Sequence, residues 1–232
     1  MQNQEKYLER EQNSKINTKI LAGKVRIPNL KAFLATLKSV ASNYDGVVVQ
    51  ALNADLVAGE EHLKSAVQKA VRAEKSGRNL TSDLGLEVLL YAAGRRQIGR
   101  ALEIGVSASE REGDEKSVAV VIFDAVREGE GKREKELDLE AVAAEVKRKT
   151  GLEEEAVLEL NEAKRERIKK FFGVTEAELR AVGEGKGEGK GEGEGKGEGE
   201  GKGEGKGEGK GKGEEKLGKL VLERVALLEV LK

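Results

Sequence analysis

The alternation of apolar and polar residues along the chain predicts three strands separated by helices. Residues 19–27 alternate loosely and stop at Pro28, residues 47–52 open with three valines, and residues 117–123 are apolar almost throughout. Short segments of this kind, bounded by turn residues, are typical of strands. We therefore expect these three segments to form the core of a sheet.

Helical spacing of apolar residues predicts most of the remaining elements. The pattern runs from residue 30 to 41 and, most clearly, from residue 59 to 76, where Gly77 is suited to end the helix in the left-handed conformation. Two later helices are expected after Asp138 and Thr175, and the second follows a capping-box sequence. The outer elements of the fold are thus predicted to be helical.

Residues 86–93 are apolar nearly throughout, so periodicity alone leaves helix and strand open. Capping residues at 81–83 and Gly94 after the segment favour a helix. Strands interleaved with helices indicate an α/β or α+β fold. We expect a mixed central sheet flanked by several helices.

A glycine-rich tract interrupts the foldable chain. From Gly183 to Gly213 every odd position is Gly and every even position is Glu or Lys, so the tract has no apolar residue to bury. We expect a disordered tether that spans about 30 Å and lets the chain return to the same domain. Residues 1–18 are polar and aperiodic, which predicts a flexible tail. Residues 19–182 and 214–232 are expected to form one domain.

The last apolar segment, residues 217–231, contains more apolar positions than one buried helix face requires. Ten of its fifteen residues are apolar. Such a helix is either buried on most sides or shared with a partner. We expect four residues to face the domain, namely Leu217, Leu220, Val221 and Leu228. Three others are then expected to contact a partner protein: Leu222, Val225 and Leu231.

Composition excludes several functional classes. The 42 basic and 43 acidic residues nearly cancel, so net charge alone does not attract nucleic acid, although a local basic patch remains possible. The chain has no cysteine and one histidine, which excludes a cysteine nucleophile and argues against a metal site; no cofactor is expected. No apolar run approaches the ~18 residues of a membrane span, and no signal peptide is evident. These observations favour a cytoplasmic protein that does not contact a membrane.

Basic residues gather between positions 64 and 100 with few acidic neighbours. A solvated helix face is one interpretation of such a charge run. Contact with nucleic-acid phosphates is the other, with amide side chains as hydrogen-bonding neighbours and an apolar side chain as a surface for a base. The candidate RNA-binding residues are Arg72, Lys75, Arg78, Asn79, Arg95, Arg96, Gln97 and Ile98.

The one histidine, His62, lies near the start of the clearest predicted helix. A general base in a small hydrolase is the catalytic interpretation. No Ser, Cys or second His is arranged around it in the sequence, and no phosphate-binding loop is present. We therefore favour a structural role for His62 and expect no catalytic residues.

Several motifs, in their order along the chain, resemble one protein family. They are Leu52-Asn53-Ala54-Asp55-Leu56-Val57-Ala58-Gly59, Gly77-Arg78-Asn79-Leu80, Glu87-Val88-Leu89-Leu90-Tyr91, Arg96-Gln97-Ile98, Arg167-Ile168-Lys169-Lys170-Phe171-Phe172-Gly173-Val174 and Glu223-Arg224-Val225-Ala226-Leu227-Leu228. The family is the kinase-binding regulatory subunit of the archaeal KEOPS complex, which includes the human PRPK-binding protein. The glycine-rich tract is not a feature of that family.

The resemblance implies a non-enzymatic role. A subunit of this family binds and activates the atypical kinase of KEOPS and docks the CCA end of tRNA for threonylcarbamoyl-adenosine modification. The implied partners are the kinase and tRNA, without a small-molecule substrate. Two alternatives remain at this point: a self-associating structural module, and a small hydrolase that uses His62.

Overall fold

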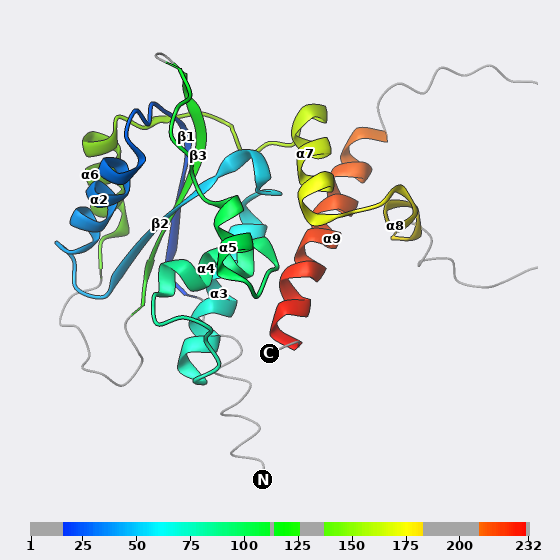
Figure 1. Ribbon diagram of the computed structural model, residues 1–232, viewed down its shortest axis with the longest axis horizontal. Coiled ribbons are helices and arrows are strands. Elements are labelled where there is room, and N and C mark those ends of the chain that lie inside the picture. The colour runs from blue at the N-terminus through cyan, green and yellow to red at the C-terminus, as the bar shows by residue number, and fades with distance from the viewer. Residues whose placement is uncertain (1–15, 112–113, 126–136, 183–208, 231–232) are drawn as a thin grey trace, which may run out of the picture.

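The computed structural model describes residues 16–111, 114–125, 137–182 and 209–230 (Figure 1). Its sheet has four strands in the order β2-β3-β1-β4. Their bounds are Thr18–Val25 (β1), Val47–Asn53 (β2), Lys116–Asp124 (β3) and Glu153–Glu154 (β4). The three predicted strands are confirmed, and the α+β class with them.

The expected mixed sheet is wrong, because each pair of neighbouring strands in this sheet is antiparallel. Strands β1 and β2 run in the same direction and are joined through a helix, a pattern that suggests parallel neighbours. Strand β3, which follows much later in the chain, lies between them and pairs with both. The parallel strands therefore never touch.

The two-residue strand β4 has no periodicity that could predict it. It pairs with Gly23 and Lys24 at the edge of β1. A Cβ atom at Gly23 would lie 1.9 Å from the carbonyl oxygen of Glu153, so only glycine allows this approach. Strand β4 can therefore pair with β1 at this position because Gly23 has no side chain.

Helices cover both faces of the sheet (Figure 1). One face carries α2 (Leu30–Ala41) and α6 (Leu139–Thr150), whose buried residues share a core with Val118, Val120 and Ile122 of β3. The alternate β3 residues, 119, 121 and 123, belong to a second core on the opposite face. Strand β3 is apolar throughout because both of its faces are buried.

The second face carries the remaining helices, which together with their connecting loops include every candidate site residue that the structure describes. They are α3 (Glu60–Lys75), α4 (Leu84–Ala93), α5 (Ile98–Ala101), α7 (Glu162–Phe172), α8 (Glu176–Ala181) and α9 (Gly209–Val230), with short 3-10 turns η1 (Ala54–Leu56) and η2 (Leu102–Ile104). Residues 86–93 are therefore helical. The Asp83 side chain accepts a hydrogen bond from the Leu86 N–H at 3.0 Å, and Gly94 ends the helix with φ of 60°.

Helix α9 begins at Gly209, so residues 209–213, expected to belong to the tether, are helical. Residues 183–208 lie outside the described part of the chain. The four residues expected to face the domain, Leu217, Leu220, Val221 and Leu228, are buried as predicted.

The expectation that Val225 is left for a partner is wrong, because its exposed fraction is 0%. Val225 lies four residues after Val221 and three before Leu228, which places it on the same helix face as both. Leu222 is half-buried, and Leu231 lies outside the described residues. The large apolar side chains that α9 exposes are Leu227, at 47%, and Val230, at 80%.

Candidate functional site

Helices α3 and α4 form an antiparallel pair, which decides how the candidate RNA-binding residues are placed. His62, at the start of α3, bonds Ala92 at the end of α4. Glu87, in α4, accepts hydrogen bonds from the N–H groups of Leu80 and Thr81 in the connecting loop. The candidates therefore separate to opposite ends of the pair, about 15 Å apart along the ten residues of α4. We refer to the two groups as the Arg78 end and the Arg95 end.

The Arg78 end comprises Arg72, Lys75, Arg78 and Asn79. The backbone of Arg78 closes α3 by donating to the Ala73 carbonyl at 2.8 Å, and its Nε donates to the Ser76 hydroxyl at 3.0 Å. The Asn79 amide donates to the Thr81 carbonyl at 2.8 Å, so it supports the loop itself. Lys75 and Arg78 are exposed, whereas Arg72 and Asn79 are half-buried. This end therefore presents mainly two cations.

The Arg95 end comprises Arg95, Arg96, Gln97 and Ile98, all of which are exposed. Ile98 is 43% exposed and Leu102, on the following turn, is 53% exposed. Two arginines, one amide and an apolar surface thus lie together on one short loop and helix. Of the two groups, this one combines the features that hold a single-stranded nucleic acid.

The loop that carries the Arg95 end is fixed from two sides. A Cβ atom at Gly94 would lie 3.2 Å from the Arg224 carbonyl oxygen, so the loop lies directly against the backbone of α9. The Arg95 guanidinium donates through Nη2 to the carbonyl of Phe171 at 3.1 Å, at the end of α7. The position of the basic loop therefore depends on α7 and α9.

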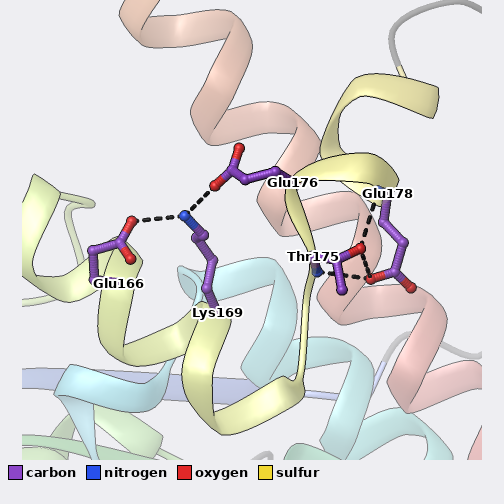
Figure 2. Close-up of polar contacts among 5 residues, drawn as sticks. All are labelled: Glu166, Lys169, Thr175, Glu176 and Glu178. Carbon is purple, nitrogen blue, oxygen red and sulfur yellow. Dashed lines mark hydrogen bonds and ion pairs between the residues drawn. The ribbon is translucent and has the colours of Figure 1, made fainter.

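Polar contacts stabilise the turn between α7 and α8, as Figure 2 shows. Lys169 forms ion pairs with Glu166 at 2.7 Å and with Glu176, and these hydrogen bonds raise its pKa. Thr175 and Glu178 form the predicted capping box. This turn therefore joins two helices by charge as well as by packing.

Glu178 also connects α8 to α9. Its carboxylate accepts a charge-assisted hydrogen bond from Arg224 at 2.5 Å. The backbone N–H of Thr175 and the Arg224 guanidinium together lower the pKa of Glu178 to about 2. The carboxylate therefore stays ionised at physiological pH and can pair with Arg224 throughout that range.

His62 has a structural role, as we expected. Its Nδ1 accepts the N–H of Ala58 at 3.2 Å, and its Nε2 donates to the Ala92 carbonyl at 2.8 Å. Burial lowers its pKa to about 4, so the ring is neutral, and it packs edge-on against Phe172 at 5.6 Å between ring centroids. Both ring nitrogens form hydrogen bonds and the His62 side chain is 1% exposed, so neither nitrogen is available as a general base.

The structure also shows a buried lysine that the sequence did not mark. Lys164 of α7 is 2% exposed and donates to the Val157 carbonyl at 2.7 Å. Burial lowers the pKa of Lys164 to about 8. The nearby Asp55 carboxylate pairs with Arg167 at 2.8 Å and holds α7 against η1. Lys164 lies in a polar stretch of sequence, so no pattern distinguishes it from its exposed neighbours.

Other site types are not found in the described part of the chain. No group of three or more His, Asp or Glu side chains there could hold a metal ion. No helix in the described ranges is both long and apolar enough to cross a bilayer. Fold and surface together define an α+β protein with a basic loop and with two exposed apolar side chains, Leu227 and Val230, on its last helix.

Comparison with known families names the particular family. Residues 14–229 match the family model described as kinase binding protein CGI-121, and the chain therefore belongs to this family of non-catalytic kinase-binding subunits. The resemblance and the non-enzymatic role expected from the sequence are confirmed. No curated protein matches the chain.

Proposed function

We propose that this chain is a cytoplasmic, archaeal KEOPS subunit that binds and activates the atypical kinase and docks the CCA end of tRNA. Its membership of the kinase-binding CGI-121 family supports the first role. The tRNA-docking role is supported by one observation, the exposed, acid-poor Arg95 end with the apolar side chains of Ile98 and Leu102.

The RNA-binding role follows from the side chains of the Arg95 end. Arg95 and Arg96 supply charge for phosphates, and the Gln97 amide supplies hydrogen bonds to base edges. Ile98 offers an apolar face on which an unstacked base can lie. These contacts suit a single-stranded end, and they do not require a basic protein.

The kinase-binding role is assigned to the exposed side of α9. Leu227 and Val230, three residues apart on one helix, expose apolar surface, and Leu222 is half-buried. A few apolar anchors supply most of the energy of such an interface. Leu231 lies outside the described residues and remains a predicted contact.

A gel-shift titration with tRNA tests the RNA-binding role. Arg96→Glu and Arg78→Glu, made separately, should each weaken binding and flatten its salt dependence. Lys31→Glu is the matched control, because Lys31 is exposed on α2, across the sheet from both basic ends. Binding by both arginine variants that equals that of Lys31→Glu would contradict the proposed RNA role.

Co-purification with the kinase subunit tests the other role. Leu227→Asp should abolish co-purification and stimulation of the kinase's ATPase while the subunit stays folded. The same exposed strip could instead join two copies of this chain, so the size of the protein is measured alone and with the kinase. A stable dimer that excludes the kinase would favour the self-associating module.

A further inference from the structure

We propose that the RNA-binding surface continues from the Arg95 end onto the last turn of α7, where Lys170 makes a further contact with an RNA phosphate. This inference rests on the proposed tRNA-binding function. It adds a residue from a part of the chain about 75 positions away from the basic loop.

The hydrogen bond between Arg95 and Phe171 brings the two segments together. The Phe171 carbonyl belongs to the last turn of α7, where carbonyl groups lack partners within the helix. The Arg95 guanidinium satisfies it at 3.1 Å. A cation at this position also offsets the negative end of the helix dipole, which would otherwise repel a phosphate. Arg95 therefore makes the end of α7 more favourable for an anion, together with Lys169 and Lys170 of its last turn.

Lys170 differs from the other cations in the second half of α7. Arg167 pairs with Asp55, and Lys169 pairs with Glu166 and Glu176. Lys170 is exposed, and no ion pair or hydrogen bond engages its ammonium group among the residues that the structure describes. Its charge is thus available to a ligand.

Position decides which RNA contacts Lys170 can share. The carbonyl that Arg95 bonds belongs to the residue after Lys170, so the backbone of Lys170 lies beside the Arg95 end, whereas the Arg78 end lies about 15 Å away along α4. A strand whose phosphates contact Arg95 and Arg96 reaches α7 without leaving this surface. Lys170, Arg95 and Arg96 then contact successive phosphates of one RNA strand. Helix α9 packs against the basic loop at Gly94 and so holds the loop in place.

The test is a gel-shift titration of the full chain with tRNA over a range of salt concentrations. Lys170→Gln should weaken binding about three- to tenfold at low salt and reduce the slope of log K against log salt by about 0.7, the value for one contact with a single strand. Lys170→Arg keeps the charge and should bind like the wild type. Lys31→Gln, which removes the same charge on the opposite face of the sheet, should leave affinity and slope unchanged.

Three outcomes would overturn the inference. If Lys170→Gln binds like the wild type while Arg96→Glu is weakened, the RNA does not reach α7 and the proposed function stands. If Lys31→Gln is weakened as much as Lys170→Gln, the effect is only one of net charge. If Arg96→Glu and Arg78→Glu also bind like the wild type, the proposed RNA function itself fails. Circular dichroism of each variant confirms that the comparison is between folded proteins.

Discussion

Replacement of Val225 by aspartate gives the sharpest test of the described packing of α9. The Val225 side chain is fully buried in the core formed with helices α3, α4 and α7. Its loss removes about 1.5 kcal/mol or more of apolar burial, and the new carboxyl group adds several kcal/mol of desolvation without a partner. The total exceeds about 4 kcal/mol, a large part of the 5–15 kcal/mol by which domains are usually stable.

Urea unfolding followed by circular dichroism measures this effect. With a typical slope of about 2 kcal/mol per molar urea, a loss of 4 kcal/mol lowers the midpoint by about 2 M. The matched control is Leu227→Asp on the same helix, where the replaced side chain is 47% exposed. The control should lose less than about 1 kcal/mol.

Equal unfolding midpoints for the two variants would refute the reasoning, because both residues would then be on the surface of the free domain. A folded Val225→Asp protein that fails to bind the kinase would show instead that Val225 is an interface residue. The placement of α9 against the domain would then differ from the one described.

Three further results follow from the structure. The NMR signal of His62 should titrate near pH 4. Because the unfolded state binds the His62 proton more tightly, the free energy of unfolding should fall by up to about 3 kcal/mol as the pH drops from 6.5 to 4. The His62→Gln variant should lose this acid sensitivity, which tests the cause. Lys164 also binds its proton more tightly in the unfolded chain than in the folded protein. The free energy of unfolding should therefore rise by up to about 3 kcal/mol between pH 8 and 10.5, relative to Lys164→Met in parallel urea titrations. The absence of this difference would place the Lys164 amine in solvent. Shortening residues 183–208 to about ten glycine-rich residues should change stability by less than about 1 kcal/mol in the same assay, because closure entropy grows only logarithmically with loop length.

Local features of the structure follow from the sequence because their causes are local. Asp83 and Thr175 cap α4 and α8 through hydrogen bonds within three residues along the chain. Gly77 and Gly94 take positive φ values where the expected helices end. Such signals predict where an element begins and ends, and alternation of apolar residues predicts most strands.

The candidate site was predicted only in part from the sequence. The basic residues were found, but their division into two ends was not, because it depends on the antiparallel packing of α3 against α4. Lys170 had no signal in the sequence, since its neighbours Arg167 and Lys169 look alike there and differ only in their ion-pair partners.

By itself the sequence determined most of the helices and strands, several of their caps, the family resemblance, and the absence of cysteine and of a second histidine. Tertiary structure decided the insertion of β3 between β1 and β2, the burial of Val225 and the contact of Arg95 with α7. Helical spacing tells which residues share a face, but the width of the covered face depends on how many other elements pack against it. Those neighbours come from distant parts of the chain, and only the folded chain brings them together.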